Sequence, residues 1–174
     1  MKDTEIIESL RSKLNIPGGR HLYGVLGSYD ALEAFSKKLR QARTMDGRNF
    51  PKPLNVNRGI LDTIPDDEFR QLVENEAKKP EPTAAQVGKA FESFLRAKLR
   101  GKGLVTLANL ELIFAYRLEL NLLRTLAADD DRILLFLPGK RSGGRIALFP
   151  KWEGAEYSLP TNLIAADHLW EIKE

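Results

Sequence analysis

Apolar residues recur along the chain at two spacings, one typical of helices and one typical of buried strands. Apolar positions three or four residues apart predict helices, at residues 3–15, from Asp30 onward, within 60–79 and from Thr83 to about residue 99. Short apolar runs predict strands, at residues 21–26, 54–56, 104–109, 132–137, 145–149 and, as a last edge strand, 168–172. Because strands alternate with helices, the order predicts an α/β fold with a mainly parallel sheet.

Polar and proline residues set the expected ends of these helices. Glu33 lies three positions after Asp30, and Gln86 three positions after Thr83, which is the spacing of a capping box. Pro80-Glu81-Pro82 is expected to be a linker between two helices. Residues 111–127 are rich in leucine around much of a helical circumference, which predicts one deeply buried helix.

The run from Arg132 to Pro150 contains two apolar segments around a basic turn rich in glycine, Gly139–Gly144. A phosphate-binding loop lies between a strand and a helix, so that helix N–H groups point at the anion. Here the glycines lead into a second strand-like segment that stops at Pro150. The run therefore predicts a C-terminal β-hairpin, with glycines that supply positive φ.

Length and composition limit the remaining classes of protein. The 174 residues suit a single α/β domain, with an N-terminal helix at 1–15, a core at 20–150 and a C-terminal tail at 151–174. The sequence has no cysteine and a net charge of only +3, which by itself does not imply nucleic-acid binding. The N-terminus lacks the apolar segment of a signal peptide, and no apolar run has membrane-spanning length. We expect a cytoplasmic protein without a membrane partner.

The first strand and its following turn lie where a nucleotide-binding protein carries its phosphate loop. Gly27-Ser28-Tyr29-Asp30 lacks the lysine that such a loop needs, and Asp30 would repel phosphates. We expect a structural turn in which Ser28 or Asp30 caps the following helix. Glu111 follows the strand at 104–109, where Mg²⁺ would lack its usual acidic ligand, and it suits a helix N-terminus. The sequence thus predicts a single-domain sandwich that resembles a degenerate P-loop-like core, without catalytic residues, cofactor or metal.

Basic and aromatic residues supply the candidate contact sites. One basic group consists of Arg96, Lys98, Arg100 and Lys102, and the other of Lys140, Arg141 and Arg145. They are expected to contact a phosphate backbone or an acidic protein surface, unless they are simply a solvated helix end and a soluble hairpin tip. Two tail tryptophans, Trp152 and Trp170, are either core residues or anchors for a partner.

The C-terminal motif resembles a known family. Residues 134–139, which end in an apolar-Pro-Gly step, and residues 143–149, which form a Leu-Phe strand, are similar to the BrxB family of BREX bacteriophage-defence systems. The leucine-rich segment at 104–123 and the Tyr29-Asp30 pair resemble the same family, so the resemblance covers about residues 20–150.

The resemblance implies a non-enzymatic adaptor in a complex that blocks phage DNA replication and marks host DNA by adenine methylation. The implied partner is the PglZ-like protein of the alkaline-phosphatase superfamily, with other BREX components, and any contact with nucleic acid would be indirect. Lys140, Arg141, Arg145, Trp152 and Trp170 are the expected partner contacts. One alternative is a nucleotide-binding protein with a degenerate P-loop, like the BREX protein BrxF. A further alternative is a DNA-binding accessory subunit that uses Arg96, Lys98, Arg100 and Lys102.

Overall fold

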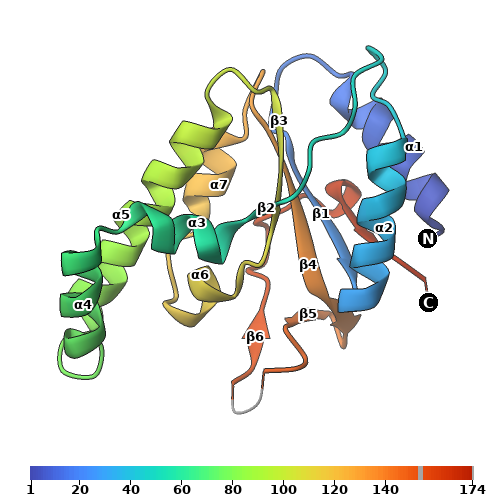
Figure 1. Ribbon diagram of the computed structural model, residues 1–174. Coiled ribbons are helices and arrows are strands. Elements are labelled where there is room, and N and C mark those ends of the chain that lie inside the picture. Colours follow the sequence, from blue (N-terminus) through green and yellow to red (C-terminus); the bar gives the residue numbers. More distant parts are fainter. Residues whose placement is uncertain (153–154, 174) are drawn as a thin grey trace.

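The computed structural model describes residues 1–152 and 155–173. Helices and strands alternate along the chain, as the apolar pattern predicts (Figure 1). The elements are α1 Asp3–Leu14, β1 Leu22–Gly27, α2 Tyr29–Gln41, β2 Leu54–Asn55, α3 Val56–Thr63, α4 Asp66–Asn75, α5 Pro80–Leu99, β3 Leu104–Ala108, α6 Glu111–Ala115, α7 Asn121–Leu126, β4 Arg132–Ser142, β5 Arg145–Leu148, β6 Tyr157–Ser158, the 3₁₀ turn η1 Ala166–His168 and β7 Leu169–Glu171.

Five strands form a parallel sheet in the order β2-β3-β4-β1-β7. Every residue of β1 is buried, because β1 has a neighbour on each side and helices on both faces. The predicted edge strand near residues 168–172 is confirmed, since β7 pairs with β1 at the end of the sheet. The C-terminal segment therefore completes the sheet and does not lie beside it.

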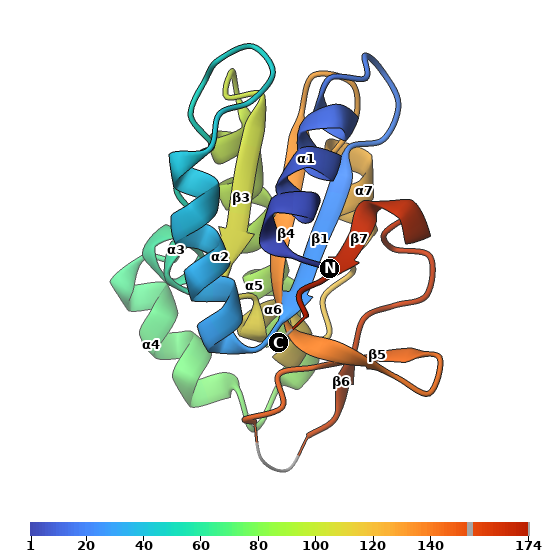
Figure 2. The ribbon, with the colours of Figure 1, turned by 90° about the vertical axis from the view of Figure 1, so that its right-hand side faces the viewer.

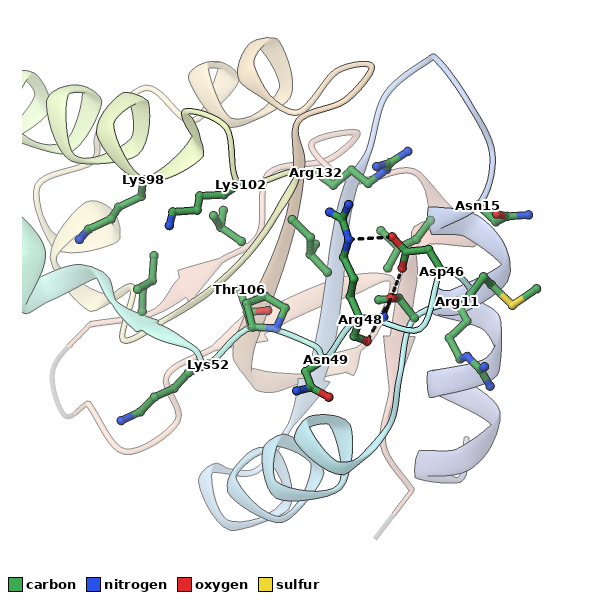
Figure 3. A pocket seen from close by; sticks show the side chains of 18 of the residues that line it. Arg11, Asn15, Asp46, Arg48, Asn49, Lys52, Lys98, Lys102, Thr106 and Arg132 are labelled. Carbon is green, nitrogen blue, oxygen red and sulfur yellow. Dashed lines mark hydrogen bonds and ion pairs between the residues drawn. The ribbon is translucent and has the colours of Figure 1, made fainter.

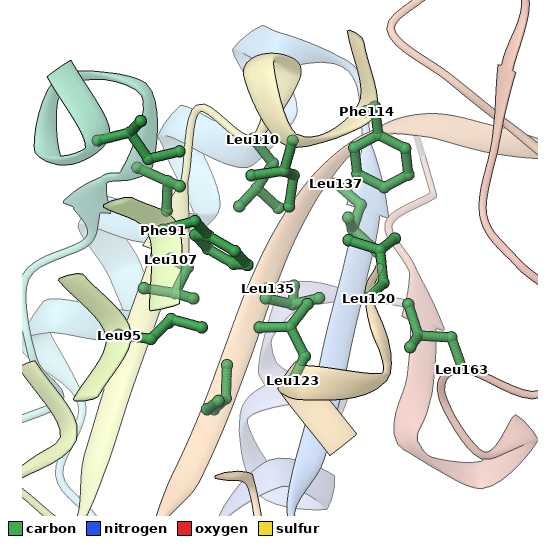
Figure 4. Packing of buried hydrophobic residues seen from close by; sticks show 14 of the residues in the cluster. Phe91, Leu95, Leu107, Leu110, Phe114, Leu120, Leu123, Leu135, Leu137 and Leu163 are labelled. Atoms are coloured by element: carbon green, nitrogen blue, oxygen red, sulfur yellow. The ribbon is translucent and has the colours of Figure 1, made fainter. Parts of the chain in front are cut away.

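Helices cover both faces of the sheet. On one face, α1 and α2 pack apolar side chains, among them Ile6, Leu10 and Phe35, against β1 and β4 (Figure 2). On the other face, α3, α5, α6 and α7 pack against β3 and β4, and Figure 4 shows Phe91, Leu107 and Leu135 in that core. The predicted α/β fold with a mainly parallel sheet is thus confirmed.

The helix predicted from Thr83 begins earlier, at Pro80. Proline is favoured in the first turn of a helix, where the missing N–H has no intrahelical partner in any case. The prediction of a linker at residues 80–82 is wrong for this reason. Thr83 is not a cap either, since its hydroxyl donates to the carbonyl of Lys79 within the helix.

The leucine-rich segment at 111–127 forms two short helices, α6 and α7, where one long helix was predicted. The helices are separated at Arg117, whose φ of 50° lies in the left-handed region and stops helical propagation. The bend lets Phe114 of α6, Leu120 at the N-cap of α7 and Leu123 within α7 all face Leu135 and Leu137 of β4 (Figure 4).

The predicted C-terminal hairpin is confirmed, but its turn is shorter than expected. β4 continues through Pro138 to Ser142, and only Gly143 and Gly144 form the turn, with φ of 54° and 79°. Gly139 pairs with Leu148, and a Cβ on Gly139 would lie 2.3 Å from the carbonyl oxygen of Ala147. This glycine is therefore needed for close strand approach and not for the turn. β5 also pairs with β6, so the antiparallel extension makes the sheet mixed.

Candidate functional site

A pocket of about 620 Å³ opens at the edge of the sheet where the strands begin. Its origin is the short β2, which pairs only with Leu107 and Ala108 of β3. On that side, the first half of β3, from Leu104 to Thr106, therefore has no neighbouring strand and lines the pocket. We call this cavity the basic pocket, and its size is within the range of small-molecule sites.

Six cationic side chains and one carboxylate line the basic pocket, and they come from four parts of the chain. The cations are Arg11 of α1, Arg48 and Lys52 of the α2–β2 loop, Lys98 and Lys102 at the end of α5, and Arg132 at the start of β4. Figure 3 shows Lys98 and Lys102 on one side of the cavity, Arg11 on the other, and Arg48 between them. The arrangement concentrates positive charge in a concave space.

The α2–β2 loop holds Arg48 over the cavity by its own hydrogen bonds. The backbone N–H of Thr44 donates to the carbonyl of Arg48 at 2.9 Å, and the N–H of Arg48 donates to the Thr44 hydroxyl at 3.1 Å. The carboxylate that lines the pocket, Asp46, lies 3.1 Å from the Arg48 Nε (Figure 3). Asp46 therefore compensates Arg48, and Glu8, which lies outside the pocket, compensates Arg11 at 2.7 Å, so four cations have no carboxylate partner among the described residues.

Three buried side-chain N or O atoms in the described residues have no hydrogen-bond partner, and all three belong to residues of the basic pocket. They are the Nε of Arg11, the Oγ1 of Thr106 and the Nε of Arg132. Thr106 has no exposed surface at all. Because buried polar groups in native proteins are nearly always paired, this concentration sets the pocket apart from the rest of the described chain.

A second polar group lies at the opposite edge of the sheet, where the strands end. Asn57, Glu111 and Tyr29 follow the carboxyl ends of β2, β3 and β1, respectively. The Asn57 amide donates to the Glu111 carboxylate at 2.9 Å, and the Tyr29 hydroxyl lies 3.4 Å from the other carboxylate oxygen. The Lys151 ammonium lies 5.1 Å from the Tyr29 ring centroid. We call these four residues the carboxyl-edge cluster.

The carboxyl-edge cluster satisfies its own polar groups. Glu111 is 6% exposed, and Asn57 also accepts a 3.0 Å hydrogen bond from the N–H of Leu112. Burial and the neighbouring Glu111 carboxylate raise the pKa of Tyr29, so its hydroxyl stays protonated and able to donate. Ligands of open α/β sheets usually bind at this edge. Here a buried carboxylate faces that position and opposes a phosphate.

The turn between β1 and α2 is the position of the expected degenerate phosphate loop. Ser28, not Asp30, caps α2, and its hydroxyl accepts from the N–H of Ala31 at 3.2 Å. The capping box predicted at Asp30 is therefore wrong, because the helix begins one residue before it. The turn carries no cationic side chain of its own.

The hairpin separates its basic residues onto two faces. Lys140 pairs with Ala147 and Arg145 with Ser142, so Lys140 and Arg145 share one exposed face. Arg141 lies on the other face, where its guanidinium donates to the Leu169 carbonyl at 3.1 Å and lies 3.7 Å from Glu171. Arg141 therefore fastens the hairpin to β7, and Lys140 and Arg145 form no ion pair within the described residues.

The two tail tryptophans occupy different environments. Trp152 is 39% exposed and contacts the rings of Phe149 and Tyr157. Trp170 is 6% exposed and stacks on Tyr23 with a centroid distance of 6.0 Å. The indole of Trp170 is thus a core group beneath α1 and α2, and of the two only Trp152 presents an aromatic surface to solvent.

The structure divides the basic residues expected to contact nucleic acid. Lys98 and Lys102 line the basic pocket. Arg96 lies outside the pocket and pairs with Glu92 one helical turn away, at 2.9 Å. Arg100, also outside the pocket, is exposed at the C-cap of α5. Of the four residues, the pocket therefore includes Lys98 and Lys102 and leaves out Arg96 and Arg100.

Sequence reasoning missed four cations of the basic pocket, Arg11, Arg48, Lys52 and Arg132. They lie in three separate segments, since only Arg48 and Lys52 share a loop, and no local charge run marks them. It also missed an apolar surface on α3 and α4, where the exposed side chains of Leu61, Phe69 and Val73 line a cavity of about 170 Å³.

No helix in the described residues is apolar over a length that would cross a bilayer. Comparison with protein-family models, with curated proteins and with solved structures gives no match.

Proposed function

We propose that the protein is a non-catalytic adaptor of a BREX-like phage-defence complex and that it binds a PglZ-like protein. The observation that carries the proposal is the β4–β5 hairpin. Of the residues that resemble the BrxB family, 134–138 lie in the parallel sheet as part of β4. Gly139 and residues 143–148 belong to the hairpin, which projects beyond that sheet (Figure 2). Its outer face presents Lys140 and Arg145 to solvent.

The hairpin is held rigidly enough to serve as a docking element. Two contacts link it to the end of the sheet, one from the Arg141 guanidinium to the Leu169 carbonyl and one from the Arg141 N–H to the Glu171 carboxylate at 3.2 Å. A positioned element loses less conformational entropy when a partner binds. Lys140 and Arg145 then offer two charges to an acidic surface of the partner.

Exposed apolar side chains supply a second kind of contact. Leu61, Phe69 and Val73 lie together on α3 and α4, and Val73 is 55% exposed. Contiguous apolar surface of this kind marks sites of protein–protein interaction. Trp152 adds one exposed aromatic group after the end of β5. These groups support an adaptor, whose function depends on contact surfaces.

We also propose that the α/β fold contains a degenerate P-loop-like core. The parallel order β2-β3-β4-β1-β7, in which β1 leads directly into α2, supports a degenerate P-loop-like core. The absence of lysine from residues 27–30 and the buried Glu111 both oppose phosphate binding at that turn. The adaptor is therefore favoured over the nucleotide-binding alternative at this position.

The direct experiment is co-purification with a PglZ-like protein after co-expression of the system's components. We expect the chain to be retained with the tagged PglZ-like protein. The double variant Lys140→Glu with Arg145→Glu should reduce retention at least about tenfold, because two docking charges are reversed. Lys78→Glu with Lys79→Glu, an equal charge change at exposed positions before α5, is the matched control. A chain that elutes alone in the presence of all components contradicts the proposal.

The nucleotide-binding alternative has a separate test at the β1–α2 turn. Ser28→Asp keeps an oxygen that can cap α2 and adds a negative charge where a P-loop phosphate would lie. If ATP with Mg²⁺ binds and Ser28→Asp abolishes that binding, the degenerate P-loop is a nucleotide site.

A further inference from the structure

We propose that the basic pocket binds a small organic phosphate of nucleotide size that carries more than one negative charge. The proposal goes beyond the adaptor function and does not depend on it. The pocket lies at the edge where the strands begin, and the degenerate P-loop turn lies at the edge where they end.

The charge of the pocket selects an anion with several charges. Two of its six cations have a carboxylate partner, because Asp46 pairs with Arg48 and Glu8, outside the pocket, pairs with Arg11 at 2.7 Å. Lys52, Lys98, Lys102 and Arg132 form no ion pair anywhere in residues 1–152 and 155–173. Like charges gathered in a concave space repel one another and attract anions into it. A single carboxylate ligand would balance only a small part of this charge.

The unpartnered buried atoms independently point to a ligand with several acceptor oxygens. The Thr106 hydroxyl, on the floor of the pocket, has no exposed surface and no partner. The Nε atoms of Arg11 and Arg132 are buried donors without acceptors. Phosphate oxygens accept from hydroxyl and guanidinium donors in charge-assisted hydrogen bonds. One ligand in the cavity is the simplest way to satisfy these groups together.

The shape and the apolar part of the lining favour a small molecule over a nucleic-acid strand. Leu14, Pro17, Met45 and Leu104 line the pocket together with the cations. These side chains suit the uncharged part of an organic phosphate, such as a base or sugar. A nucleic-acid strand needs a basic groove that follows its backbone. Arg96 and Arg100 lie outside the cavity, so the positive charge does not continue along α5 in that way.

The experiment measures binding of ADP to the full chain by equilibrium dialysis, with adenosine, inorganic pyrophosphate and a short single-stranded DNA as further probes. We expect ADP to bind more tightly than adenosine or pyrophosphate, and its affinity to fall as salt rises. Lys98→Glu with Lys102→Glu should weaken ADP binding at least about tenfold. The control pair Lys78→Glu with Lys79→Glu should leave it within about twofold.

A second variant keeps the test valid if the charge reversals disturb folding. Thr106→Val preserves side-chain shape in β3 and removes the buried hydroxyl, so ADP binding should weaken about threefold in a folded protein. Ser28→Asp should leave ADP binding unchanged, because it alters the other edge of the sheet. The proposal is overturned if ADP does not bind at millimolar concentration, if the pocket variants bind it normally, if pyrophosphate or adenosine alone binds equally well, or if only the DNA binds.

Discussion

At the edge of the sheet where the strands end, the carboxyl-edge cluster buries a carboxylate and satisfies it with side chains from neighbouring segments. At the edge where the strands begin, the basic pocket holds six cations and three unpartnered buried atoms. Parallel α/β sheets usually bind their ligands at the carboxyl edge. In this chain the polar groups of that edge bind one another, and the groups without partners are at the opposite edge.

The physical origin of the difference is the unequal length of the strands. β2 covers only the last part of β3, so the carboxyl end of β3 is enclosed and its beginning is open. Asn57 follows β2 directly and reaches Glu111, which couples the two segments at the enclosed end. At the open end, the α2–β2 loop and the end of α5 surround a cavity instead. One short strand thus separates an edge with a structural role from an edge available to a ligand.

The same substitution at the two edges should have very different effects on stability. Asn57→Ala removes the partner of the Leu112 N–H, which is partly buried, and a partner of the Glu111 carboxylate, which stays buried. We expect the free energy of unfolding to fall by about 2 to 3 kcal/mol, measured by urea denaturation. Asn15→Ala, on the rim of the basic pocket, is the control, because the Asn15 side chain forms no hydrogen bond among the described residues. The control should change stability by less than about 0.5 kcal/mol. Equal losses at both sites would show that the two edges are not organised differently.

Removal of a buried polar group from the basic pocket should instead increase the free energy of unfolding. Thr106→Val replaces an unpartnered hydroxyl by a methyl group of similar shape in a strand that favours valine. We expect the free energy of unfolding to rise by about 1 kcal/mol, because an unsatisfied buried group is removed. Thermal and urea unfolding without added ligand measure the change. A loss of more than about 1 kcal/mol would mean that the hydroxyl has a structural partner, and the pocket would then resemble the carboxyl edge.

Local patterns in the sequence were sufficient to predict most of the fold. Each predicted strand exists, because a short apolar run between turn residues specifies a buried strand without reference to its neighbours. The failures occurred where packing of the whole chain decides the outcome. Residues 111–127 are helical by local pattern, yet the segment bends at Arg117 so that both halves reach β4. The turn at Gly139 was misplaced because its glycine serves a cross-strand contact that only the register shows.

Much less of the candidate site than of the fold could be predicted from the sequence. Lys98 and Lys102 were found because they lie in one local charge run. Arg11, Arg48 and Arg132 are separated by dozens of residues and join them only through the order of the strands. Trp170 and Trp152 are both aromatic residues of the tail, and only the pairing of β7 with β1 shows that the first is buried. A site assembled from distant segments leaves no periodic signal in the sequence.

A buried histidine at the beginning of β1 should make stability depend on pH. The Nε2–H of His21 donates to the Gly18 carbonyl at 2.8 Å, so Nδ1 of the neutral ring accepts from the Tyr23 hydroxyl at 2.6 Å. Burial lowers the pKa of His21 below its ordinary value of 6.5, against the effect of the Gly18 hydrogen bond, and the charge of Arg132 lowers it further. The unfolded chain therefore takes up the proton first as the pH falls.

The expected result is full stability above pH 6.5 and a decline as the pH falls from 6.5 toward the lowered pKa of folded His21. Urea unfolding at pH 7.5 and at several values down to pH 5 measures this decline, and His21→Gln should reduce its slope. A variant with the same slope as the original chain would assign the decline to other groups. His168→Gln, at the other histidine of the sequence, should change the slope less, because the charge of His168 is one of the smaller causes of the lowered pKa of His21.

The smallest expected effect compares an uncompensated cation of the basic pocket with a paired cation on the same helix end. Lys102 lines the pocket without an ion pair, whereas Arg96 lies 2.9 Å from the Glu92 carboxylate. Lys102→Gln relieves repulsion and should raise the free energy of unfolding by up to about 0.5 kcal/mol at low salt, and Arg96→Gln should lower it by a similar amount. Both differences should shrink in about 1 M NaCl, because the salt screens charges over about 3 Å. If Lys102→Gln is instead destabilising at low salt, the positive charge of the pocket is already compensated in the free protein, and a bound anion is not needed to balance it.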